Sequence, residues 1–329
     1  MKIKSFSISL LLLISICSFG QHKYAVVKTF HINSAGGWDY ISVNNNKLYV
    51  SHGTQVNILN EETGDSVGII PNTNGVHGIA FDNSLHRGYT SNGRSNNVTV
   101  FDLNDNKIVG EIATGENPDA IMYDPYTKTI ITCNGRGKSL SIINPKNNTV
   151  ISTIDVGGKP ETAVSDEAGK LFVNIEDKSE IAEVDLKNYK VTNRWSLKPG
   201  EGPSGLVYDK STKRLFSTCD KLLVVMNAMN GKIVAKIPIG DGTDGAAFDP
   251  SSKTIFTSNG EGTITAVKEI NADNYKVLGN YKTKRGARTI AIDEKKHKLY
   301  LPTADFEAAT TTTGRPKMVP GTFQILVVQ

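Results

Sequence analysis

Short runs of alternating apolar and polar residues recur along almost the whole chain. In one stretch these runs cover residues 120–123, 129–133, 139–143 and 149–154, and each is bounded by Asn, Gly, Pro or Asp. Such alternation between turn-forming residues is typical of β-strands, because successive side chains of a strand point to opposite faces of a sheet. No window of about a dozen residues has the periodicity of an amphipathic helix. The pattern therefore predicts an all-β protein.

The four runs belong to a repeat that occurs seven times. A bulky residue in the second run marks each copy, at Tyr49, Tyr89, Ile131, Phe172, Phe216, Phe256 and Tyr300. Successive markers are 40 to 44 residues apart. A turn Asp precedes the marker in six copies, at Asp82, Asp124, Asp166, Asp209, Asp249 and Asp293. Four-stranded repeats of this length are typical of β-propellers, whose blades bury their faces against one another. The sequence predicts a seven-bladed β-propeller.

The two ends of the chain supply complementary parts of one blade. The last copy has a third-strand pattern at residues 323–328 and no fourth strand. Residues 24–32 resemble the fourth strands at 107–113 and 232–239 but have no first three strands of their own. We therefore expect the N-terminal segment to complete the last blade, so that residues 21–329 form a single propeller domain.

The first twenty residues have the composition of a secretory signal. Lys2 and Lys4 precede an apolar run at 8–16, and Ser18-Phe19-Gly20 offers small residues at a cleavage site. We expect residues 1–20 to be a signal peptide and the mature protein to be periplasmic or extracellular. An uncleaved anchor and lipidation at Cys17 are the alternatives, and Ile16 argues against lipidation.

Charge and hydropathy exclude several classes of partner. The formal net charge is +4, and removing Lys2 and Lys4 leaves +2. A nearly neutral surface gives no electrostatic basis for nucleic-acid binding. No second apolar run approaches the ~20 residues of a membrane span. We expect a monomer whose partner is a small molecule or another protein, with Cys133 and Cys219 either free or joined in a long-range disulfide.

The second strand and its loop carry a recognisable motif. Tyr89-Thr90-Ser91-Asn92 and Phe256-Thr257-Ser258-Asn259 approximate a Tyr-Val-Thr-Asn sequence, and Asp124-Pro125 and Asp249-Pro250 occupy the preceding turns. With these motifs, residues 21–329 resemble the YVTN-repeat, or YncE-like, β-propeller family. The resemblance implies an exported seven-bladed propeller and supplies no catalytic residues. The Asn of the motif is replaced in four copies, by His52, Ile175, Cys219 and Thr303.

Candidate site residues follow from the propeller geometry, in which the first strand of every blade lines a central channel. The residues at the start of these strands are Asp39, His77, Asp119, Glu161, Ser204, Asp244 and Arg288. We predict that they surround the channel mouth and bind a ligand, since convergent polar groups in a concave site are the usual basis of ligand binding. Two alternatives stay open. The groups could pair with one another in a solvated funnel, or they could hold a metal. The metal candidates are Asp39, Asp119, Glu161 and Asp244, whose oxygens suit Ca²⁺. No other cofactor is evident.

Loops that join the second and third strands should form a rim around this mouth. Their candidate residues are His52, Arg94, Arg136 and Glu261, with Arg315 in an insertion at 305–320 in the last copy. The arginines either are solvated or bind an anionic group. The insertion is either partly disordered or a flap over the mouth.

These features favour a non-catalytic binding or protein-interaction module. The alternative is a metal-dependent, lactonase-like hydrolase that uses the carboxylates of the mouth. The chain has no Gly-x-Ser-x-Gly sequence, and its six histidines fit no close-spaced metal or triad motif. The binding module is therefore the expectation, and catalytic residues are unassigned.

Overall fold

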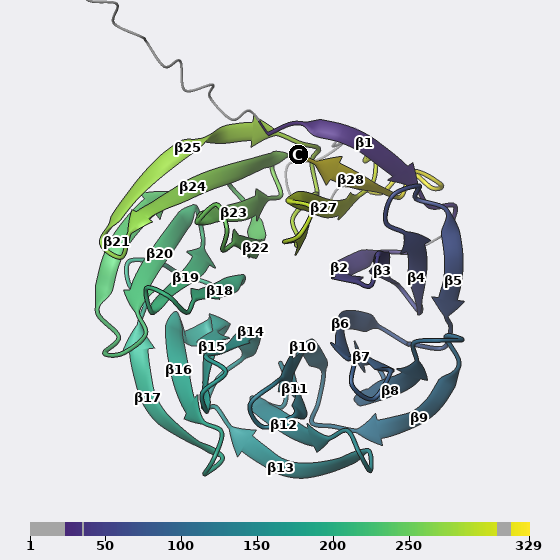
Figure 1. Cartoon of the computed structure of the whole chain (residues 1–329), viewed down its shortest axis with the longest axis horizontal. Coiled ribbons are helices and arrows are strands. Elements are labelled where there is room, and N and C mark those ends of the chain that lie inside the picture. The colour runs from purple at the N-terminus through teal and green to yellow at the C-terminus, as the bar shows by residue number, and fades with distance from the viewer. Residues whose placement is uncertain (1–23, 35, 308–316) are drawn as a thin grey trace, which may run out of the picture.

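The computed structural model describes residues 24–34, 36–307 and 317–329. Within these ranges the chain forms seven four-stranded antiparallel sheets, which are arranged radially around a common centre (Figure 1). This confirms the predicted seven-bladed β-propeller. The 3-10 turn Glu176–Lys178 is the one helical element in the described ranges, where no helix has the length and apolar character to cross a membrane. The predicted signal at 1–20 lies outside the described residues.

Six of the blades use four consecutive strands. Blade 1 contains β2 (Trp38–Asn44), β3 (Lys47–His52), β4 (Gln55–Asn60) and β5 (Ser66–Ile70), and blade 2 contains β6 (Val76–Asp82), β7 (Arg87–Asn92), β8 (Asn97–Asp102) and β9 (Ile108–Ala113). Blade 3 contains β10 (Pro118–Asp124), β11 (Thr129–Asn134), β12 (Ser139–Asn144) and β13 (Thr149–Asp155). Blade 4 contains β14 (Pro160–Ser165), β15 (Lys170–Ile175), β16 (Glu180–Asp185) and β17 (Lys190–Ser196). Blade 5 contains β18 (Leu206–Asp209), β19 (Arg214–Cys219), β20 (Leu222–Asn227) and β21 (Ile233–Pro238), and blade 6 contains β22 (Thr243–Asp249), β23 (Thr254–Asn259), β24 (Thr263–Asn271) and β25 (Asn274–Lys282).

Blade 7 combines the two ends of the chain. It contains β26 (Ala291–Asp293), β27 (Lys298–Thr303), β28 (Gln324–Val328) and, at its outer edge, β1 (Val26–His31). Strand β1 pairs antiparallel with β28, from Val26 opposite Val328 to His31 opposite Gln324. In Figure 1 the purple β1 runs beside the yellow β28. The predicted closure is therefore confirmed, and backbone hydrogen bonds between β1 and β28 close the ring.

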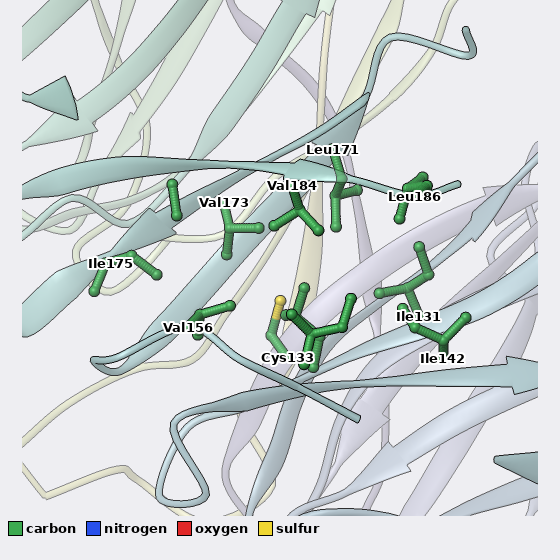
Figure 2. Close-up of a cluster of buried hydrophobic side chains, with 12 residues drawn as sticks. Ile131, Cys133, Ile142, Val156, Leu171, Val173, Ile175, Val184 and Leu186 are labelled. Carbon is green, nitrogen blue, oxygen red and sulfur yellow. The ribbon is translucent and has the colours of Figure 1, made fainter. Parts of the chain in front are cut away.

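Apolar seams between neighbouring blades form the core. Figure 2 shows the seam in which Ile131, Cys133 and Ile142 of blade 3 face Val173 and Val184 of blade 4, and all five are at most 1% exposed. The seven marker residues of the repeat are at most 2% exposed. A single sheet cannot bury both of its faces, so each blade depends on its neighbours.

Two sets of polar interactions explain the regular spacing of the repeat, and the first involves the turn Asp. Asp82 accepts hydrogen bonds from the Ser84 amide at 3.0 Å and the Ser84 hydroxyl at 2.6 Å, and Asp124 accepts one from the Thr127 amide at 2.7 Å. Such side-chain bonds to amides two or three residues ahead stabilise tight turns. The Asp therefore fixes the turn between the first and second strands.

The second set involves the Asn that ends the second strand. Asn134 is fully buried, donates to the Ser141 hydroxyl at 2.9 Å and accepts from the Thr132 hydroxyl at 2.9 Å. Asn92 and Asn259 make equivalent bonds in blades 2 and 6. This Asn clamp joins the second strand to the third, so the repeated motif has a structural role.

Both cysteines of the propeller are free, buried thiols. Burial raises the pKa of Cys133 well above its ordinary value and that of Cys219 to about 12. The long-range disulfide is therefore not formed, and the two thiols contribute to the apolar seams.

Candidate functional site

The predicted mouth residues occupy equivalent places in their blades. Asp39, His77, Asp119, Glu161 and Asp244 are each the second residue of a first strand. The other two mouth residues, Ser204 and Arg288, precede β18 and β26. Ser204 is buried, and its hydroxyl contacts Thr218 Oγ1 at 3.1 Å and the Thr243 carbonyl at 3.0 Å. It therefore joins blade 5 to blade 6, while the six charged residues form the mouth.

Hydroxyl groups of neighbouring strands hold the backbone of this ring. The Ser91 hydroxyl accepts the Gly78 amide at 2.8 Å and donates to the Asp119 carbonyl of the next blade. Thr289 donates to the Asp39 carbonyl at 2.6 Å. A Cβ on Gly78 would lie only 2.9 Å from Ile121 Cγ2, so glycine lets the first strands of blades 2 and 3 approach closely. The ring residues thus sit on a rigid scaffold.

Four residues of blades 6, 7, 1 and 2 form what we call the paired arc: Asp244, Arg288, Asp39 and His77. Arg288 Nη1 lies 3.0 Å from Asp244 Oδ2, and its Nη2 lies 3.5 Å from Asp39 Oδ1. His77 Nδ1 lies 2.6 Å from Asp39 Oδ2. Burial favours the neutral imidazole, but the Asp39 hydrogen bond and the Asp119 charge raise the pKa of His77 overall. Opposite charges therefore alternate along this arc.

Asp119 and Glu161 of blades 3 and 4 form the open arc, in which two carboxylates follow one another. The Oδ1 atom of Asp119 and the Oε2 atom of Glu161 are both buried without a hydrogen bond. His77 Nδ1 is 3.7 Å from the first oxygen, and Lys159 Nζ is 3.2 Å from the second. Burial is the main reason that the pKa of both carboxyl groups is raised; the charge of Asp39 adds to this at Asp119, and the charge of Asp119 adds to it at Glu161.

A small cavity lies between the first strands of blades 1 to 4, and neither residue of the open arc lines it directly. This cavity has a volume of about 150 Å³. It is lined largely by residues that follow the ring positions on the first strands of blades 1 to 4, namely Tyr40, Ile41, Ser42, Gly78, Ile79, Ala120, Ile121, Met122, Thr162 and Ala163. Burial and the mouth carboxylates, Asp119 foremost, raise the pKa of Tyr40 well above its ordinary value. The cavity is therefore mostly apolar, with one phenol among the carboxylates.

A second, wider cavity opens at the opposite end of the channel. Its volume is about 810 Å³, and it shares Met122 and Ala163 with the smaller one. Its outer lining comes from turns between first and second strands, including Pro125, Lys210 and Pro250. The sequence analysis did not predict this cavity. Its width depends on the spacing of the first strands, which carry small side chains such as Ala163 and Ala246.

The predicted rim residues have different environments. Arg94, Arg136 and Glu261 are exposed on their loops, and Glu261 Oε1 accepts from the Thr263 hydroxyl at 2.8 Å. Arg315 lies outside the described residues. His52 is only 1% exposed: Nδ1 lies 2.5 Å from the Ser34 hydroxyl, and Nε2 lies 2.8 Å from the Gly36 carbonyl. Burial lowers the pKa of His52, so its imidazole is neutral and part of the packing.

The described ends of the insertion at 305–320 form a short two-stranded stem. Phe306 pairs with Met318, and the Glu307 amide donates to the Lys317 carbonyl at 2.8 Å. The ring of Phe306 lies 6.0 Å from that of Trp38, which precedes Asp39. The stem therefore stands near Trp38 on the mouth face of the propeller, and residues 308–316 lie outside the described ranges.

Two contributors to the mouth were missed by the sequence analysis. Lys159 reaches Glu161 and also pairs with Glu176. A signal was present, because Lys159 and Glu161 are two residues apart, and alternate residues of a strand share a face. Tyr40 directly follows the ring residue Asp39, and its place among the carboxylates depends on the packing of blades 1 to 4.

The closest potential metal ligands are Asp39, His77 and Asp119, whose ligand atoms all lie within 4.8 Å of one another. Of the four predicted metal candidates, this group contains two, and Asp244 is paired instead with Arg288. Two carboxylates and an imidazole suit a transition metal better than Ca²⁺. Coordination through His77 Nδ1 requires the loss of its bond to Asp39.

Comparisons with known proteins agree with this architecture. The chain is similar in structure to Kuenenia stuttgartiensis hydrazine synthase, with a TM-score of 0.73 and 15% sequence identity. The alignment covers 82% of this chain and 94% of that chain. The chain is a β-propeller. At this identity the likeness shows the fold alone. No protein-family model matches the chain. No curated protein matches it either.

Proposed function

We propose that this β-propeller is a non-catalytic binding module that holds a small ligand at its channel mouth. One observation carries the proposal: charged side chains from six blades converge on one narrow opening, above a cavity of about 150 Å³. Buried polar groups that converge on a concave site are the usual basis of specific ligand recognition. A rigid ring loses little conformational freedom on binding, and this lowers the cost of association.

The ion pairs of the paired arc favour binding over catalysis. Arg288 and His77 are each held between carboxylates. The raised pKa of His77 extends the pH range over which its imidazole is protonated, and a protonated imidazole donates hydrogen bonds from both ring nitrogens. These groups are therefore suited to orient a ligand.

A metal-dependent hydrolase is the second candidate, and the Asp39, His77 and Asp119 cluster supports it. These three residues would hold the metal, which would supply Lewis-acid activation of a substrate carbonyl or of water. The chain's own part would be to fix the ligand atoms, with Glu161 nearby to exchange a proton. This function requires His77 to bind in its neutral form.

Metal analysis with a hydrolysis assay separates the two candidates. Purified protein would be incubated with ZnCl₂, MnCl₂ or CaCl₂ and assayed on δ-valerolactone, with Asp119→Asn as the matched variant. The binding module predicts equal background rates for both proteins. It also predicts that a small-molecule mixture observed by saturation-transfer NMR contains compounds that bind the wild type and lose binding in Asp119→Asn. Metal-dependent turnover that disappears in Asp119→Asn would establish the hydrolase instead.

We also propose that the protein is an exported member of the YVTN-repeat, or YncE-like, family. The support is the repeated motif itself, in which Asn92, Asn134 and Asn259 have the same clamping role in three blades. Residues 1–20 support export through their basic and apolar composition. Expression of the full chain in a bacterial host tests this: a periplasmic protein beginning at Gln21 is expected, and an uncleaved cytoplasmic chain would refute export.

A further inference from the structure

Charges alternate around the mouth until they reach the open arc. In the paired arc, Asp244 lies 3.0 Å from Arg288 and Asp39 lies 2.6 Å from His77. Asp119 and Glu161 then follow in adjacent blades with no cationic ring position between them. This sector of the mouth therefore has two successive carboxyl groups without a cationic ring residue between them, and Lys159 beside Glu161 is its nearest ammonium group.

Both carboxylates of this sector have an oxygen suited to accept from a further donor. Asp119 Oδ1 is buried without a hydrogen bond, Glu161 Oε2 is buried with the Lys159 ammonium 3.2 Å away, and Glu161 as a whole is only 9% exposed. The Lys159 ammonium near Glu161 is shared with Glu176. Buried carboxylate oxygens without donors are costly, so a cationic donor between the two blades would satisfy both at once.

The residues that follow Asp119 and Glu161 in the chain, Ala120 and Thr162, line a cavity that indicates what else the ligand carries. Its lining is largely Ile, Ala, Gly and Met side chains, together with the Tyr40 ring. A cavity of about 150 Å³ accommodates a group the size of a benzene ring. A bare metal ion would leave the apolar cavity empty. An amine with a short hydrocarbon part would contact the carboxylates and also fill the cavity.

We infer that the mouth recognises an organic cation, namely a protonated amine that donates to Asp119 Oδ1 and Glu161 Oε2 and places a short apolar group in the cavity. This rests on the proposed binding function and specifies its ligand class. The donated bonds are charge-assisted and therefore stronger than neutral ones. Tyr40 adds an aromatic surface, which favours cations.

The same arrangement makes binding pH-dependent. Burial, and after it the charge of Asp119, raise the pKa of the Glu161 carboxyl to about 8, so this group of the pair holds its proton near neutral pH. An ammonium group favours the ionised pair and releases that proton. Affinity should therefore increase with pH until the amine itself loses its charge. The other titratable or charged groups that face the pair are Asp39, His77, Asp244, Arg288, Lys159, Glu176 and Tyr40.

Isothermal titration calorimetry with n-butylammonium chloride tests the inference, with neutral n-pentanol and anionic pentanoate as matched probes. The propeller should bind n-butylammonium in preference to the other two. Glu161→Gln and Asp119→Asn should each weaken binding by about tenfold or more, because each removes a charge-assisted bond. Asp105→Asn, which removes a carboxylate paired with Lys107 in the turn between β8 and β9 and outside the mouth, should change the affinity by less than about twofold. Circular dichroism and the melting temperature report whether each variant is folded.

Each result has a definite meaning. Equal binding of n-pentanol, or n-butylammonium binding that survives both open-arc substitutions, would overturn the inference. Pentanoate binding at the mouth that requires Arg288 would also overturn it while retaining the binding module. Stoichiometric Zn²⁺ binding that blocks n-butylammonium and is lost in His77→Gln would replace the amine with a metal. If none of the three probes binds, the organic-cation site is refuted, and the saturation-transfer experiment alone then decides the proposed function.

Discussion

Blades 3 and 4 meet twice, once in the apolar seam and once at the mouth, and the two contacts differ in kind. In the seam, side chains such as Ile142 and Val173 are fully buried against other apolar groups (Figure 2). At the mouth, the same two blades present Asp119 and Glu161 with oxygens that have no hydrogen bond. The seam stabilises the ring, and the mouth retains an unfavourable pair of groups. Unfavourable groups persist where surrounding structure compensates for them, and they are often functional.

The seam should show the largest response to mutation. Leu171 is fully buried in the seam between blades 3 and 4, so Leu171→Ala leaves a cavity. We expect the free energy of unfolding to fall by about 3 kcal/mol, measured by urea denaturation. Ile151 on the outer strand is 45% exposed, and Ile151→Ala should cost less than about 0.5 kcal/mol. Similar losses in both variants would show that the seam is not the source of stability.

The Asn clamp should show the second-largest response to mutation. Asn134→Ala removes hydrogen bonds to Thr132 and Ser141 inside blade 3. We expect a loss of about 2 kcal/mol in unfolding free energy, because buried partners are left unsatisfied. Asn92→Ala should lose a similar amount in blade 2, where the clamp is equivalent. A loss confined to one blade would contradict a shared structural role for the motif.

At the mouth, removing a charge should stabilise the protein. The folded-state pKa of Glu161 is raised, so the native state holds its proton more tightly than the unfolded chain does. The stability of the wild type should therefore fall as pH rises from the ordinary carboxyl range through the raised pKa. Glu161→Gln removes this titration. The variant should exceed the wild type by about 1–2 kcal/mol at about pH 8.5 and match it at about pH 4. A variant that is less stable at alkaline pH would contradict the assignment.

The smallest effect is expected in the paired arc. Arg288→Gln leaves Asp244 and Asp39 without the guanidinium, but the Arg288 side chain is 36% exposed and solvent screens its ion pairs. We expect a loss of about 0.5–1 kcal/mol that diminishes at about 1 M NaCl. A salt-independent loss would indicate that Arg288 acts through packing.

The fold could be predicted from the sequence because the same pattern of strands and turns occurs seven times along the chain. Marker residues such as Tyr89 and turn residues such as Asp124 depend on local strand and turn chemistry, which each copy carries within itself. The ring positions followed by counting along equivalent strands. Even the closing strand was visible, because residues 24–32 have the pattern of a fourth strand.

The pairing within the site could not be predicted in the same way. Whether His77 pairs with Asp39, or Arg288 with Asp244, depends on side-chain positions across different blades. The burial of His52 depends on a loop that brings Ser34 and Gly36 to its ring. Such contacts arise from packing between repeats, and the repeat pattern contains no information about them.

Proton release on ligand binding is the most direct test of the open arc as a cation site. Calorimetric titration of n-butylammonium in two buffers of different ionisation enthalpy, at about pH 7.5, counts the protons released for each ligand bound. The account predicts substantial release from the wild type and almost none from Glu161→Gln. Binding without proton release, or equal release from both proteins, would contradict it.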